Sequence, residues 1–112
     1  MIPEFDVHAD NPTVAISVLR LENYLKMARS KYRIIKIIHG YGSTGKGGAI
    51  RSAIRQKLDD YLHLGMIKAY IPGEALTSLM GYADLIFQYK NELKGDSDYH
   101  RGNDGITFVI FR

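Results

Sequence analysis

Two histidines and an aspartate are the side chains of this sequence best suited to catalysis. His39 ends an apolar segment at residues 33–38, and His8 follows Asp6 by two residues. Imidazole titrates near neutral pH, so it suits general acid–base catalysis, and a carboxylate can orient an imidazole or bind a metal. We therefore expect Asp6, His8 and His39 to be catalytic residues at one site.

A glycine-rich segment directly after His39 is the second candidate part of the site. Five glycines fall within residues 40–48, between an expected strand and an expected helix. Glycines let backbone N–H groups approach a ligand closely, and a helix start adds partial positive charge, so we expect a phosphate or another anion here. The candidate binding residues are Gly40, Tyr41, Gly42, Ser43, Thr44, Gly45, Lys46, Gly47, Arg51 and Arg101. The ring of Tyr41 is also a candidate for stacking on a nucleic-acid base.

The same glycines match two nucleotide-binding patterns. Gly40, Gly42 and Gly45 spell the G-x-G-x-x-G of dinucleotide-binding folds, and G-x-x-x-x-G-K also fits. The first pattern expects an acidic residue at the end of the next strand, which here ends in Ile71-Pro72. The second expects a magnesium-binding Ser or Thr where Gly47 stands. A small nucleotide-binding protein and a purely structural glycine turn both remain alternatives.

The elements that position these residues follow from hydrophobic periodicity. Alternating or continuous apolar runs predict strands, and apolar residues every three to four positions predict helices. The predicted strands cover residues 4–9, 33–39, 66–71 and 105–111, and the predicted helices cover 12–30, 49–62 and 74–93. This order predicts an α/β two-layer sandwich with a four-stranded mixed sheet, β-α-β-α-β-(α)-β. The first crossovers should join parallel strands, which places His8 and His39 at one sheet edge, and the last strand should be antiparallel to a neighbour.

Composition limits the class of protein. The chain has 112 residues, a formal net charge of +3 and no cysteine, so we expect one domain without disulfides or thiolate sites. No apolar run approaches the roughly 20 residues that a membrane span needs. The first residues lack the pattern of a signal peptide, so we expect a cytoplasmic protein. The mild positive charge favours a polyanionic partner such as nucleic acid.

Taken in order, three motifs of the chain resemble those of the Smr domain, the small MutS-related nuclease module. The H-G-x-G motif stands at residues 39–42, after Ile37-Ile38. The L-D-L-H-G motif is similar to residues 5–9, with Ala9 in place of the last glycine. The closing G-A-T-x-V type of strand is similar to residues 105–109. The resemblance covers about residues 4–71 and 101–112, so residues 74–100 are expected to be a helical insertion.

The resemblance implies a fold similar to the C-terminal domain of translation initiation factor three, and a nuclease that nicks DNA or cleaves RNA. We therefore expect an endonuclease that uses histidine acid–base chemistry beside a glycine-rich phosphate-binding loop. The pattern predicts no resident metal or other cofactor, while assistance by weakly held Mg²⁺ remains open. A DNA- or RNA-binding module without catalysis is the alternative function. The sequence does not determine the oligomeric state.

Overall fold

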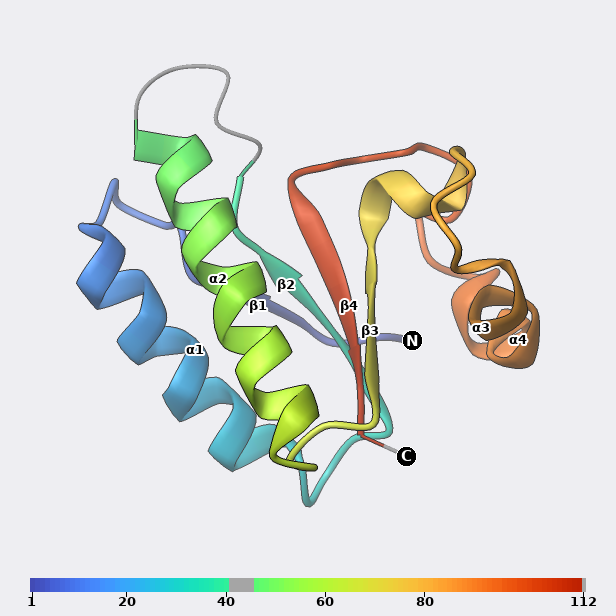
Figure 1. Ribbon diagram of the computed structural model, residues 1–112, viewed down its shortest axis with the longest axis horizontal. Coiled ribbons are helices and arrows are strands. Elements are labelled where there is room, and N and C mark those ends of the chain that lie inside the picture. The colour runs from blue at the N-terminus through green and yellow to red at the C-terminus, as the bar shows by residue number, and fades with distance from the viewer. Residues whose placement is uncertain (41–45, 112) are drawn as a thin grey trace.

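The computed structural model of the protein describes residues 1–40 and 46–111. Strands and helices alternate along the chain in the predicted order, which confirms the α/β class (Figure 1). The elements are β1 (Glu4–Asp6), α1 (Val14–Ala28), β2 (Ile34–Ile38), α2 (Lys46–His63), β3 (Ala69–Pro72), the 3-10 helix η1 (Gly73–Leu76), α3 (Ala83–Gln88), α4 (Lys90–Leu93) and β4 (Ile106–Ile110).

The four strands form one mixed sheet, as predicted. Their spatial order is β1-β2-β4-β3. Strand β1 runs parallel to β2, while β4 is antiparallel to both β2 and β3. The register pairs Asp6 with Ile38, and Ile38 with Ile106. The carboxyl ends of β1 and β2 and the amino end of β4 therefore meet at one edge of the sheet.

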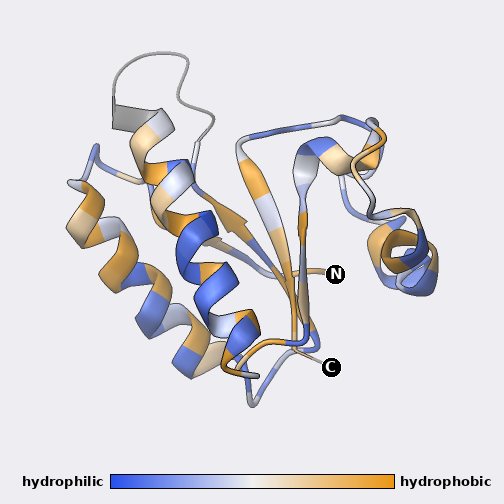
Figure 2. Ribbon diagram, in the orientation of Figure 1, coloured by the Kyte–Doolittle hydropathy of each residue, from blue (hydrophilic) through white to orange (hydrophobic). Residues whose placement is uncertain are grey.

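Helices α1 and α2 cover one face of the sheet and form the two-layer sandwich with it (Figure 1). Residues from η1, α3 and α4 pack on the other face. Figure 2 shows hydrophobic residues concentrated on β2 and β4, while both colours alternate along α1 and α2. The first core contains Val7, Leu21, Leu25, Ile35, Ile37, Ile50, Ile54, Leu58 and Val109, among others. The second contains Ile34, Ile71, Tyr89, Leu93, Ile106, Phe108 and Ile110, among others. Because neighbouring residues of β2 face different cores, the strand is apolar on both sides.

The turn between β1 and α1 differs from the sequence expectation. The sequence predicts a helix from Pro12, but α1 begins at Val14, after the N-cap Thr13. The side chain of Thr13 accepts a hydrogen bond from the backbone N–H of Ile16 at 3.2 Å. Asp10 and Asn11 have φ angles of 64° and 51°, in the left-handed region that Asp and Asn adopt more readily than other non-glycine residues. The chain therefore turns at these two residues and enters the helix later than predicted.

The positive φ angle of Asn11 leads to a testable prediction about stability. Asn11 is exposed, so its replacement mainly changes backbone preference. Asn11→Val should lower the free energy of unfolding by about 1–2 kcal/mol, because a β-branched residue is strained at positive φ. Asn11→Gly should stay within about 0.5 kcal/mol of the wild type. Urea denaturation measures both values, and an equal loss in the two variants would assign the effect to the asparagine side chain instead.

The predicted helix over residues 74–93 is wrong as a single element. The segment forms η1, α3 and α4 instead, with residues 77–82 between η1 and α3 outside any helix. Gly81 lies there with φ of +85°, which a right-handed helix cannot contain. Among the described residues, no helix combines the length and the apolar character that crossing a membrane requires.

Candidate functional site at the ends of β1 and β2

The ring of His8 packs against the backbone of Gly40, where β1 and β2 end. A Cβ atom on Gly40 would lie 3.1 Å from Cδ2 and 3.2 Å from Nε2 of His8. Gly40 also has φ of +76°, so its position favours glycine both by conformation and by the space available. The side chain of His8 remains half-buried rather than enclosed. This contact therefore brings the motif at residues 5–9 next to the start of the H-G-x-G motif at His39 and Gly40.

The side chain of Asp6 forms a hydrogen bond with the backbone of the turn that follows β1. Its Oδ1 accepts a hydrogen bond from the backbone N–H of His8 at 2.7 Å. The backbone N–H of Val7 donates to the carbonyl of Ile38 at 3.0 Å, which continues the pairing of β1 with β2. Asp6 thus fixes the course of the chain into His8.

Arg20 of α1 also holds this turn, and the sequence reasoning did not single it out. Its Nη1 donates to the carbonyl of Ala9 at 2.7 Å and to that of Val7 at 3.4 Å. Ser17 adds a hydrogen bond from its Oγ to the carbonyl of Val7 at 2.8 Å. Ala9 has no positive φ, because the left-handed positions of the turn come after it. Alanine in place of the motif's glycine therefore needs no strained backbone here.

His39 is fully buried, and both of its ring nitrogens have partners. Nδ1 lies 2.8 Å from the carbonyl oxygen of Gly40, and Nε2 lies 2.8 Å from Oγ1 of Thr107 in β4. Burial lowers the pKa of His39 to about 4, and the nearby positive charges of Arg55 and Arg51 act in the same direction. The imidazole is therefore neutral at pH 7 and faces the protein interior.

The partners of His39 continue into α2 and η1. Arg55 donates from Nε to Oγ1 of Thr107 at 3.2 Å. Its two terminal nitrogens donate to the two carboxylate oxygens of Glu74, each at 2.7 Å. Thr107 belongs to the closing sequence motif, while Arg51 and Arg55 stand four residues apart and so share one side of α2. That spacing is the sequence signal that could have identified Arg55 as part of this network.

The buried neutral His39 predicts a pH dependence of stability. Its pKa is about 4 in the folded protein, whereas an unfolded chain has the ordinary value of about 6.5. Between these values the unfolded state binds the extra proton, so stability falls as the pH decreases from 6.5 toward 4. Urea denaturation at pH 7 and pH 5 should show about 2 kcal/mol more loss for the wild type than for His39→Gln. His63→Gln is the matched control for replacing a histidine at an exposed position.

The backbone N–H of Gly40 is already used within the protein. Both it and the N–H of His39 donate to the carbonyl oxygen of Gly105, each at 3.0 Å. The N–H of Gly105 in turn donates to Oδ1 of Asn103 at 2.9 Å. Gly40 therefore has both its N–H and its carbonyl engaged, and its own amide is not free to bind an anion. The predicted binding residues Tyr41, Gly42, Ser43, Thr44 and Gly45 lie outside the described residues.

The predicted cationic residues have different positions. Arg51 of α2 lies close enough to His39 to affect its pKa and pairs with Asp104 at 3.1 Å, with both side chains partly exposed. Lys46 and Gly47 are the first residues of α2, and the side chain of Lys46 lies outside the described part of the chain. Arg101 is exposed in the segment before β4 and lies near Asp98, whose pKa its charge lowers.

The three predicted catalytic residues lie near one sheet edge, but both ring nitrogens of His39 have hydrogen-bond partners within the protein. Within residues 1–40 and 46–111, no three His, Asp or Glu side chains lie close enough together to hold a metal ion. Asp6, His8 and His39 are all among these residues, so they form no such group. The half-buried ring of His8 lies at this sheet edge, whereas the ring of His39 is buried beneath it.

A buried lysine organises the segment that leads to this edge from the other face of the sheet. Nζ of Lys36 lies 2.7 Å from Asp98, 2.8 Å from Asp96 and 3.0 Å from Glu4, and its side chain is 1% exposed. Burial alone would lower the pKa of Lys36, but hydrogen bonds to these carboxylates raise it above the ordinary value. Asp98 also accepts a hydrogen bond from Asn103 at 3.1 Å, which connects the cluster to the Gly105 contact.

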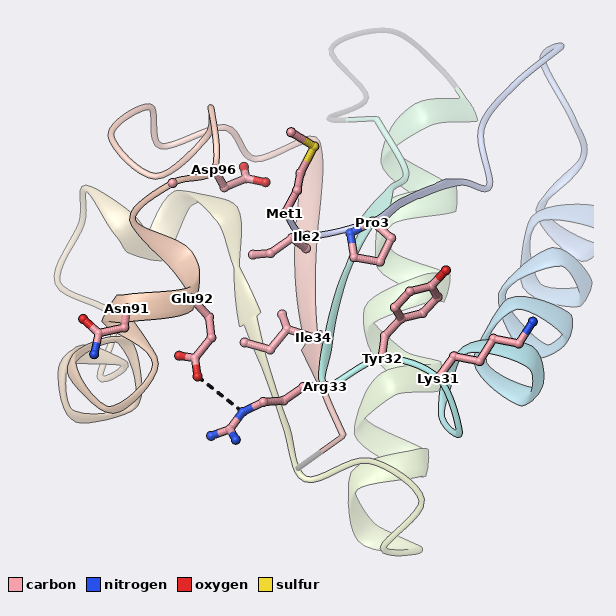
Figure 3. A pocket seen from close by; sticks show the side chains of 11 residues that line it. Met1, Ile2, Pro3, Lys31, Tyr32, Arg33, Ile34, Asn91, Glu92 and Asp96 are labelled. Carbon is pink, nitrogen blue, oxygen red and sulfur yellow. Dashed lines mark ion pairs between the residues drawn. The ribbon is translucent and has the colours of Figure 1, made fainter.

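A separate hollow of about 570 Å³ lies at the amino end of β2, far along the strand from His39 (Figure 3). An ion pair between Arg33 and Glu92, 3.4 Å apart, spans part of it. Its other lining residues include Met1, Ile2, Pro3, Tyr32, Asn91 and Asp96. None of the predicted site residues that the structure describes lines this hollow.

Comparison of the chain with protein-family models, with curated proteins and with solved structures found no match. The likeness to the Smr domain, and through it to the C-terminal domain of translation initiation factor three, therefore rests on the three sequence motifs.

Proposed function

We propose that the protein is a nucleic-acid endonuclease and that the imidazole of His8 carries out its acid–base chemistry. The observation that supports this proposal most directly is the packing of the half-buried His8 ring against Gly40. This contact puts a titratable group at the start of the glycine-rich segment, where a phosphate is expected. The ordinary pKa range of imidazole suits proton transfer at neutral pH.

One imidazole is sufficient for a balanced reaction. Neutral His8 takes a proton from the attacking oxygen, which is water for DNA or the 2′-hydroxyl for RNA. A new P–O bond forms while the bond from phosphorus to the leaving oxygen breaks. The leaving oxygen then receives a proton from the imidazolium, so His8 returns to its neutral form. General acid–base catalysis of this kind contributes about 10²–10⁴-fold to the rate.

His39 and Asp6 have supporting roles in this proposal. Both nitrogens of His39 are occupied inside the protein, so we assign it to holding Gly40 in place. Asp6 holds the backbone N–H of His8. Among the predicted cationic residues whose side chains the structure describes, we assign the contact with phosphate to Arg51, which is partly exposed beside the same edge.

The proposal is tested with purified wild-type protein, supercoiled DNA and structured RNA of matched length, with and without a chelator. We expect nicked DNA or shortened RNA, together with binding that weakens steeply as the salt concentration rises. In an Arg51→Ala variant, the slope of log affinity against log salt concentration should become shallower by about one, as expected for the loss of one phosphate contact. Intact substrates together with an absence of salt-dependent binding would overturn both the endonuclease and any nucleic-acid function. In that case, a rise in melting temperature with ATP, GTP or NAD would favour the nucleotide-binding alternative.

A non-catalytic DNA- or RNA-binding module is the second candidate function. The observation that favours it is the inward orientation of His39, which leaves one predicted catalytic imidazole at the surface of the edge. Salt-dependent binding of nucleic acid that stays intact after long incubation would support this candidate over cleavage.

A further inference from the structure

A chain of hydrogen bonds, buried at His39 and Thr107 and partly exposed at Arg55 and Glu74, connects η1 to Gly40. It runs from Glu74 through Arg55 and Thr107 to His39, and from His39 to the carbonyl of Gly40. His39 and Thr107 are both fully buried, so water does not substitute for either partner. The links from Glu74 to Arg55, from Arg55 to Thr107 and from Thr107 to His39 each join different parts of the fold, and only the last link, from His39 to Gly40, is local.

The donors and acceptors of this chain determine the protonation of His39. The carbonyl oxygen of Gly40 can only accept, so Nδ1 of His39 carries the ring proton and donates it to this oxygen. In the neutral ring, Nε2 is then an acceptor, and the hydroxyl of Thr107 donates to it. The Nε–H of Arg55 can only donate, and it uses one of the lone pairs that remain on Oγ1 of Thr107.

We propose that Thr107 is a positioning residue for His8, because its hydroxyl fixes the tautomer of His39 that holds Gly40 in contact with the His8 ring. The catalytic meaning of this inference rests on the proposed function, whereas its structural part does not. The low pKa of His39 agrees with a permanently neutral ring. Glu74 contributes to the same arrangement, because its carboxylate binds the guanidinium of Arg55 and so holds Arg55 beside Thr107.

The inference is tested by comparing Thr107→Val with Thr107→Ser. Valine has nearly the shape of threonine without the hydroxyl, whereas serine keeps the hydroxyl. Two-bond ¹H–¹⁵N spectra of the imidazole rings should show wild-type His39 as the single Nδ1–H tautomer at pH 7. Thr107→Val should lose that single tautomer and shift the ring signals of His8, while Thr107→Ser should keep both.

Cleavage kinetics provide the second measurement. Thr107→Val should lower kcat by about 10- to 100-fold with KM nearly unchanged, because small misplacements of a catalytic group are costly. Thr107→Ser should restore kcat. If the wild type cleaves neither DNA nor RNA, the proposed function fails, and the spectra alone still decide the inference about Thr107.

Glu74→Gln serves as a second variant that removes a partly exposed charge and opens no cavity. It should produce the same changes as Thr107→Val to a smaller extent. The inference is overturned if folded Thr107→Val keeps the wild-type signals of His39 and His8. If Thr107→Val does not fold, unchanged signals in Glu74→Gln overturn it equally. A wild-type protein with the ring proton of His39 on Nε2 would also contradict it.

Discussion

A His8→Ala variant is expected to cleave nucleic acid about 10²–10⁴-fold more slowly than the wild-type protein. The variant removes the imidazole that packs against Gly40 and leaves the buried network of His39 in place. Since His8 is only half-buried, the fold should persist, which a circular dichroism melt can verify. Single-turnover rates on the substrate that the wild type cleaves measure the effect directly.

Binding separates the proposed role of His8 from a general loss of the site. His8→Ala should bind nucleic acid with an affinity near that of the wild type, because the phosphate contacts are assigned to other groups. His63→Ala is the matched control, since His63 is exposed and its Nδ1 lies 2.7 Å from the carbonyl oxygen of Asp59 in its own helix. A cleavage rate that is the same in His8→Ala and in the wild type would remove His8 from the mechanism.

Lys36→Met should lower the free energy of unfolding by about 3–5 kcal/mol. The substitution removes the cation that Asp96 and Asp98 share, while their side chains stay only 5% and 12% exposed. Carboxylates left without a counter-charge in such surroundings have lost solvation that the remaining neutral hydrogen bonds do not replace. Urea denaturation at pH 7 measures the loss.

Two further variants show whether the unpaired charges cause this loss. The triple variant Lys36→Met, Asp96→Asn, Asp98→Asn should recover part of the stability, because it replaces the isolated charges with neutral groups. Lys57→Met is the control at a more exposed ion pair, in which Nζ of Lys57 lies 3.6 Å from Glu22, and it should cost less than about 1 kcal/mol. A similar small cost for Lys36→Met would contradict the importance of the buried cluster.

The fold followed from the sequence wherever apolar periodicity was strong. The runs at residues 33–38 and 105–111 gave β2 and β4, and the mixed sheet with an antiparallel last strand was correct. The errors lie where local backbone geometry overrides periodicity. Gly81 interrupts an otherwise helical pattern, and Asp10 with Asn11 turns the chain before α1. Positive φ angles of this kind leave little trace in hydrophobic patterning.

The candidate site was less accessible to sequence reasoning than the fold. The motifs indicated that His8 and His39 belong to one sheet edge, because parallel strands end together. They carried no information on which way each ring points. The inward orientation of His39 depends on Thr107 and Arg55, which are 68 and 16 positions away in the sequence. Such long-range partners become visible only once β4 and α2 have been placed.

The strand order has a consequence for how the chain folds during synthesis. Strand β4 lies between β2 and β3, yet it leaves the ribosome after the other three strands. Until residues 106–110 emerge, β3 has no neighbour to pair with, and β1 and β2 form only a two-stranded ribbon, which is marginally stable in water. We therefore expect nascent chains that stop before β4 to remain unfolded and sensitive to proteases, so that the fold is acquired in one late, cooperative step.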